Sequence, residues 1–136
     1  MTRYLIAYAG TFTVMIALDL IWLGVVAKPL YQQGLGTLML PQPDWPVAAL
    51  FYSIFALGLV IFGVAPHETA RSWPHTLLMA ALFGFFCYAT YDLTNLATLK
   101  GWPVGLSLID IAWGTAVSTA AVAGGKSLMD WAAARG

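Results

Sequence analysis

Residues 88–99 read Tyr-Ala-Thr-Tyr-Asp-Leu-Thr-Asn-Leu-Ala-Thr-Leu. This stretch places an ionisable residue, Asp92, and an amide, Asn95, one helical turn apart at the end of a long apolar segment. A carboxyl group inside the hydrocarbon layer of a membrane is costly, and it is retained where partners or function require it. We therefore expect polar groups on other segments to face Asp92.

The composition is that of a membrane protein. Hydrophobic residues make up 60% of the 136 residues and charged residues 9%, whereas a soluble domain carries about 25% charged residues. A formal net charge of zero gives no reason to expect a nucleic-acid partner. The single cysteine, Cys87, excludes a disulfide within one chain, and we expect it to be a small core residue.

Apolar windows long enough to span a membrane occur four times. Crossing the ~30 Å hydrocarbon layer takes about 20 helical residues. The sequence thus predicts an all-α polytopic protein, a four-transmembrane-helix bundle formed by one membrane domain over residues 1–136. We expect Gly124 and Gly125 to end the fourth span before a short terminal helix. The predicted spans are about 4–26, 47–64, 74–99 and 103–123.

The connector over residues 27–46 has two unlike halves. In residues 29–40, apolar side chains recur at roughly helical spacing opposite polar ones, which predicts a short helix lying in the membrane interface. An ordinary loop is the alternative, because this half also contains two glycines. Three prolines mark the second half as non-helical: Pro41, Pro43 and Pro46.

Basic residues give a modest indication of orientation. If the N-terminus is inside, four basic residues lie on the inner side and two on the outer side, which favours cytoplasmic N- and C-termini. The inner residues are Arg3, Arg71, Lys126 and Arg135, and the outer ones are Lys28 and Lys100. The two histidines of the second connector, His67 and, at its end, His75, have only Glu68 beside them, so we expect solvated side chains there and assign no metal site.

Three aspartates share one predicted depth. Each lies seven residues from the predicted outer end of its span: Asp19 from Val26, Asp92 from Leu99 and Asp110 from Pro103. At 1.5 Å per residue, each carboxyl group lies about 10 Å below the outer boundary. Tyr52, five residues into the second span, lies at nearly the same level. We therefore expect three acids and a phenol, one from each span, to form a pocket near the outer leaflet.

Companion residues share the helix faces of these acids. Residues three or four apart lie on one face of a helix. The pattern Asp-x-x-Trp occurs in both the first and the fourth span, which gives weak support for an inverted repeat. The predicted pocket residues are Asp19, Trp22, Tyr52, Tyr88, Asp92, Asn95, Ser107, Asp110 and Trp113.

The acids have no internal base to neutralise them. No lysine or arginine lies within a predicted span, and His75 lies at the opposite end of its span from Asp92. The acids are then protonated, share protons as a coupled pair with nearby donors, or hold a cation. All-oxygen ligands would favour a hard cation such as magnesium, calcium or manganese over zinc. The sequence leaves these three alternatives open and identifies no cofactor.

Several strings carry a resemblance to a known family. The chain resembles a family of bacterial predicted membrane proteins classed as a domain of unknown function. The resemblance implies a multi-pass protein of the bacterial inner membrane with four spans, and it supplies no activity and no catalytic residues. The matching strings are Arg3-Tyr4-Leu5-Ile6-Ala7-Tyr8, Leu18-Asp19-Leu20-Ile21-Trp22-Leu23-Gly24, Tyr91-Asp92-Leu93-Thr94-Asn95-Leu96-Ala97-Thr98-Leu99, Gly101-Trp102-Pro103 and Asp110-Ile111-Ala112-Trp113-Gly114-Thr115.

Three functions fit the sequence, and the sequence does not decide whether the protein is an enzyme. The first is a pocket that binds or acts on a lipid-like or other small apolar molecule. The second is a structural subunit of a larger membrane complex, or of a homo-oligomer, with the acids joining helices. The third is proton or cation transport, for which the inner halves of the spans offer few polar residues. No P-loop, dinucleotide fingerprint or nucleophile elbow occurs in the sequence.

Overall fold

The structure is a computed structural model that describes residues 1–67 and 72–136. Glu68 and Arg71 lie outside these described residues. The helical elements in order are α1 (Thr2–Ile21), η1 (Trp22–Val26), α2 (Lys28–Leu35), η2 (Gly36–Leu38), α3 (Trp45–Leu59), η3 (Val60–Val64), η4 (Ala65–His67), α4 (Trp73–Thr98) and α5 (Val104–Arg135). Here η1 and η3 are π-helical turns, while η2 and η4 are 3₁₀ turns.

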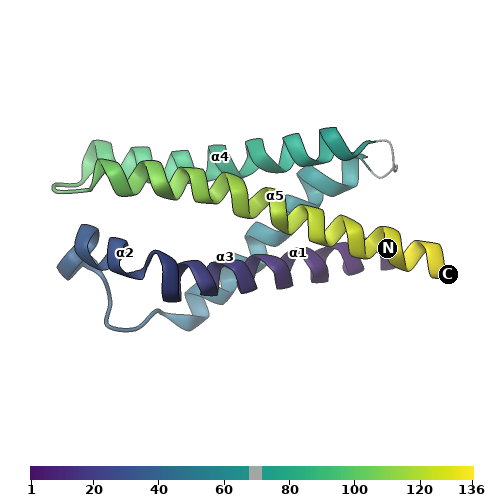
Figure 1. Cartoon of the computed structure of the whole chain (residues 1–136), viewed down its shortest axis with the longest axis horizontal. Helices are drawn as coiled ribbons and strands as arrows, with labels where there is room; N and C mark the ends of the chain where they lie inside the picture. The colour runs from purple at the N-terminus through teal and green to yellow at the C-terminus, as the bar shows by residue number, and fades with distance from the viewer. Residues whose placement is uncertain (68–71) are drawn as a thin grey trace.

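The predicted all-α, four-span fold is confirmed. Within the described residues, four helical segments are long and apolar enough to cross a membrane: Thr2–Val26, Trp45–Val64, Trp73–Thr98 and Val104–Arg135. Both termini lie at the same end of the bundle (Figure 1). The side of the membrane that this end faces stays a prediction.

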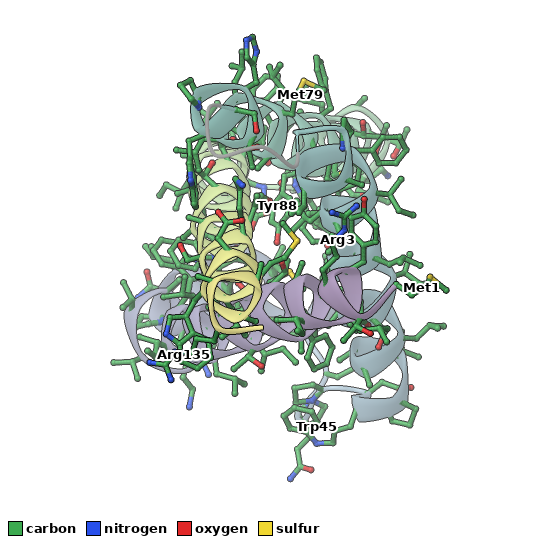
Figure 2. The ribbon with its side chains drawn as sticks, turned by 90° about the vertical axis from the view of Figure 1, so that its right-hand side faces the viewer. Met1, Arg3, Trp45, Met79, Tyr88 and Arg135 are labelled. Atoms are coloured by element: carbon green, nitrogen blue, oxygen red, sulfur yellow. The ribbon has the colours of Figure 1, made fainter. Side chains whose placement is uncertain are left out.

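The long helix α5 organises the bundle. It packs along both α1 and α4, and these are the two most extensive helix contacts in the described chain. Because α5 runs back beside each of them, it is antiparallel to both (Figure 1). The other face of α1 contacts α3, and the turn η3 packs against α4. Viewed along the long axis, Tyr88 points to the interior, whereas Trp45 and Met79 lie at the periphery (Figure 2).

The predicted break at Gly124 and Gly125 is wrong, because α5 continues through both glycines to Arg135. These residues lie where α5 crosses α1. A Cβ atom added to Gly125 would lie 2.1 Å from the Oγ1 atom of Thr11 and 2.6 Å from the carbonyl oxygen of Ala7. Small residues let two membrane helices approach this closely. The glycines therefore serve helix packing rather than helix termination.

The connector forms a helix that is shorter than predicted. α2 ends at Leu35, and Gly36 follows with a φ of 52°, a conformation that glycine adopts without strain. α2 folds back on the bundle, since a Cβ atom on Gly34 would lie 3.0 Å from Leu106 in the first turn of α5. Asp44 then caps α3 by accepting a hydrogen bond from the backbone N–H of Val47 at 3.1 Å. That α2 lies in the membrane interface stays a prediction.

Candidate functional site

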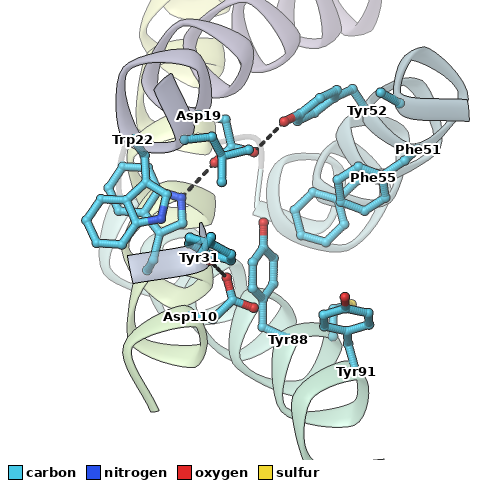
Figure 3. Close-up of a pocket in the computed structure, with 13 residues that line it drawn as sticks. Asp19, Trp22, Tyr31, Phe51, Tyr52, Phe55, Tyr88, Tyr91 and Asp110 are labelled. Atoms are coloured by element: carbon cyan, nitrogen blue, oxygen red, sulfur yellow. Dashed lines mark hydrogen bonds between the residues drawn. The ribbon is translucent and has the colours of Figure 1, made fainter. Parts of the chain in front are cut away.

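A cavity of about 550 Å³ opens at the end of the bundle where α2 folds back. All five α-helices or their extensions contribute side chains to its wall (Figure 3). The lining residues are Asp19, Trp22, Leu23, Tyr31, Ala48, Phe51, Tyr52, Phe55, Cys87, Tyr88, Tyr91, Asp110 and Trp113. Six of the nine residues that the sequence predicts for a pocket are among them.

Asp19 joins three helices at one side of this cavity. It is 5% exposed. Its Oδ1 atom accepts a hydrogen bond from the Nε1–H group of Trp113 on α5, and its Oδ2 atom accepts one from the hydroxyl group of Tyr52 on α3, both at 2.7 Å. Each carboxyl oxygen thus has a donor, which is the arrangement that suits a carboxylate.

Asp110 is held by a residue from the connector. It is 8% exposed, and its Oδ1 atom accepts a hydrogen bond from the hydroxyl group of Tyr31 on α2 (Figure 3). Burial and this hydrogen bond raise the pKa of the Tyr31 phenol above its ordinary value. The phenol therefore stays protonated and remains a donor across physiological pH. This contact ties α2 to α5 over the cavity.

Asp92 lies beside Asp110 and does not reach the cavity wall. It is 2% exposed, and its carboxyl group lies next to that of Asp110. Within residues 1–67 and 72–136, no N–H or hydroxyl donor reaches the buried Oδ2 atom of Asp92. Asp92 and Asp110 thus bring two carboxyl groups together at one side of the cavity, and the three arrangements that the sequence left open stay predictions.

The two Asp-x-x-Trp patterns meet in space. The rings of Trp22 and Trp113 stack with their centroids 4.4 Å apart and their planes 5° apart. Trp113 donates to the aspartate of the other pattern, Asp19. The reciprocal bond from Trp22 to Asp110 is not made, because Tyr31 occupies that position. The Nε1–H group of Trp22 is buried near the Tyr31 hydroxyl group without hydrogen-bond geometry.

Tyr88 forms part of the cavity wall by packing directly on α5. A Cβ atom added to Gly114 would lie 2.1 Å from the Cγ atom of Tyr88, so only glycine leaves room for the ring. The ring meets Phe55 edge to face, with centroids 5.9 Å apart and an interplanar angle of 70°. Its hydroxyl group points toward the side of the cavity that Asp19 and Tyr52 line (Figure 3).

Two predicted residues, Asn95 and Ser107, are not brought to the cavity. Ser107 accepts a hydrogen bond from Trp102 and donates one to the carbonyl oxygen of Pro103, each at 3.0 Å, and so fixes the first turn of α5. The side chain of Asn95 interacts with Tyr91. Each lies one turn nearer the α4–α5 loop than the acid on its helix, which places it beyond the level of the cavity.

Sequence reasoning missed several wall residues. Tyr31 had a signal, since it belongs to the apolar face predicted for the connector helix. Cys87 packs against the core, as expected, and it is half-buried where it also lines the cavity. The aromatic rings and aliphatic groups on α3 and α4 gave no polar signal, because they resemble lipid-facing residues. The other missed residues are Leu23, Ala48, Phe51, Phe55 and Tyr91.

The described part of the chain contains no group of three or more His, Cys, Asp or Glu side chains arranged to hold a metal ion. Asp19, Asp92 and Asp110 are instead engaged with Tyr, Trp and one another.

Comparison with known sequences identifies the family. The family described as Predicted membrane protein (DUF2177) matches residues 4–126. The chain belongs to the DUF2177 family. The match spans all three aspartates and every residue of the cavity wall, so this site lies entirely within the part of the chain that defines DUF2177. No curated protein and no solved structure matches the chain.

Proposed function

We propose that this DUF2177 protein binds a lipid-like or other small apolar molecule in the cavity between its helices. The single observation that carries the proposal is the cavity itself. Its volume of about 550 Å³ falls in the range of ~300–1,000 Å³ typical of small-molecule sites. Its wall combines many aromatic and aliphatic groups with a few convergent polar ones, as such sites usually do.

The location supports a ligand that arrives from the bilayer. The helices that surround the cavity are membrane spans, and their outer faces carry exposed apolar residues such as Leu50 and Ile54. We propose that the cavity opens toward the outer leaflet of a bacterial inner membrane, with both termini in the cytoplasm. α2 then covers its mouth, held there by the bond from Tyr31 to Asp110.

The polar groups would position the head of the ligand. Asp19 and Asp110 are held in fixed orientations at the wall, so they can accept hydrogen bonds from a hydroxyl or amine group. A proton shared by Asp92 and Asp110 next to the cavity would also suit general acid chemistry on a bound molecule.

A cavity-filling variant tests this proposal. Ala48 lines the cavity, whereas its neighbour Ala49 is exposed on the lipid-facing side of α3. We expect the wild-type protein, purified in mild detergent, to carry a small molecule that native mass spectrometry detects. The Ala48→Phe variant should lose this molecule and Ala49→Phe should keep it. Equal occupancy in the two variants, or lipid masses in the same proportions as the bulk membrane, would contradict the proposal.

A structural subunit is the second candidate. The observation that favours it is that Asp19 links α1, α3 and α5, which is also what a helix fastener would do. In that case a stoichiometric protein partner should co-purify, and Ala48→Phe should leave that association unchanged.

A further inference from the structure

We propose that the cavity selects an amphiphile whose head group carries a positive charge, such as an alkylammonium. This inference rests on the proposed function and names the chemical class of the ligand. It follows from the charges, hydrogen bonds and rings around the cavity.

The acidic side chains on the cavity wall have no basic neighbour there. Two carboxyl groups, those of Asp19 and Asp110, line the cavity, and the described residues that line it include no lysine, arginine or histidine. The buried amine of Lys126 is paired with Asp130 at 3.1 Å, near the far end of α5. The acids therefore have no cationic partner on the cavity wall.

Asp19 is held by hydrogen bonds that fit a charged acceptor. Both oxygens of Asp19 already accept hydrogen bonds, so this group is arranged as a carboxylate. Asp92 lies next to Asp110, which brings a third carboxyl group to the same side of the cavity. In this weakly screened medium, the carboxyl oxygens would attract a cation that enters the cavity.

One buried carboxyl oxygen, on Asp92, lacks a hydrogen-bond donor. The Oδ2 atom of Asp92, in a side chain that is 2% exposed, receives no N–H or hydroxyl donor from the described residues. Asp92 contacts Asp110, so its negative potential acts on the same side of the cavity. A cation near Asp110 would offset this potential, whereas a phosphate or carboxylate head would be repelled.

Aromatic rings form much of the cavity wall. The rings of Trp22, Phe51, Tyr88 and Tyr91 line the same cavity as the two acids. Aromatic faces attract ammonium groups, including quaternary ones, and the attraction is strongest where water is excluded. The rings and the carboxyl groups together therefore favour a cation with an apolar tail over a neutral alcohol of equal length.

Cys87 provides the assay, because it is the only cysteine of the chain and it lines the cavity. Its rate of alkylation by N-ethylmaleimide is measured at fixed pH in dodecyl maltoside micelles. Three probes with the same tail are added: dodecyltrimethylammonium, dodecanol and dodecanoate. A Cys87→Ala variant that carries Ala49→Cys, on the lipid-facing side, corrects for effects of each probe on the micelle.

We expect dodecyltrimethylammonium to protect Cys87 at a concentration at least tenfold below that of dodecanol, and dodecanoate to protect it least. Asp110→Asn should abolish this preference. Asp44→Asn is the matched control, because Asp44 lies outside the cavity and asparagine also caps helices. If Asp110→Asn fails to fold, the ranking of the three probes in the wild-type protein still tests the inference.

Two outcomes would overturn the inference, and they differ in what else they reject. If the alcohol protects Cys87 as well as the cation does, in wild type and in Asp110→Asn alike, the charge preference is wrong and the cavity remains a ligand site. If none of the probes protects Cys87, the proposed function fails together with the inference.

Discussion

The Nε1–H group of Trp113 donates a hydrogen bond to the Oδ1 atom of Asp19 at 2.7 Å, across 94 positions of the sequence. This bond joins the first and last helices at the level of the cavity, and Tyr52 extends it to α3. One carboxyl group thus holds three helices in place around an open space.

Replacing Trp113 with phenylalanine removes the donor and keeps an aromatic ring against Trp22. Because hydrogen bonds to charged groups are stronger than neutral ones, we expect the free energy of unfolding to fall by about 1–3 kcal/mol. Trp131→Phe is the control, since Trp131 is exposed near the end of α5. Denaturation in mixed micelles measures both variants, and equal stabilities would argue against the role given to the indole N–H group.

Replacing Tyr31 with phenylalanine should loosen α2 from the bundle. The variant loses the hydrogen bond to Asp110 that holds α2 over the cavity. We expect Cys87 to react several-fold faster with a water-soluble maleimide at constant pH. Tyr8→Phe serves as the control, because the Tyr8 hydroxyl group bonds to the backbone of Ser53 and does not line this cavity. An unchanged rate in Tyr31→Phe would show that α2 does not cover the cavity.

The phenol of Tyr31 gives a pH dependence whose sign follows from its surroundings. Burial and the bond to Asp110 raise its pKa in the folded protein above the ordinary value of about 10. Its contribution to stability is then fully present below pH ~10 and is lost as the pH rises further. The difference in phenolate absorbance between wild type and Tyr31→Phe should stay flat through pH 10 in the folded protein and appear only after unfolding. A phenolate signal near pH 10 in the folded protein would contradict this.

The close crossing of α1 and α5 predicts a large effect from one methyl group. In Gly125→Ala the new Cβ atom meets Thr11 and the backbone of Ala7, so the helices must move apart. We expect a loss of about 1–3 kcal/mol, as for other overpacked sites. Gly105→Ala in the same helix is the matched control, since its Cβ atom has no neighbour within 4 Å. Thermal unfolding in detergent compares the two variants, and we expect Gly125→Ala to have the lower melting temperature.

The sequence predicted the parts of the site that depend on length and periodicity. Counting residues from the ends of the spans put Asp19 and Asp110 at one level, and both line the cavity. Counting could not show that Asp92 pairs with Asp110 behind the wall, because that depends on how α4 is rotated against α5.

Other features depend on tertiary packing that local sequence does not encode. Glycine ends many helices. Gly124 and Gly125 instead lie within α5, where the close approach of α1 requires them. The contribution of Tyr31 depends on the fold of α2 back over the bundle. Neither can be read from hydrophobic periodicity, which reports faces of helices and not their partners.

Photocross-linking in the native membrane tests most directly whether the cavity is a ligand site. A benzophenone amino acid is placed at Phe55, which is 6% exposed and lines the cavity, or at Leu50, which is 60% exposed on the same helix. After irradiation, mass spectrometry identifies what each position has captured. We predict one discrete small molecule at position 55 and a mixture of bulk lipids at position 50. The same lipid mixture at both positions would contradict the account.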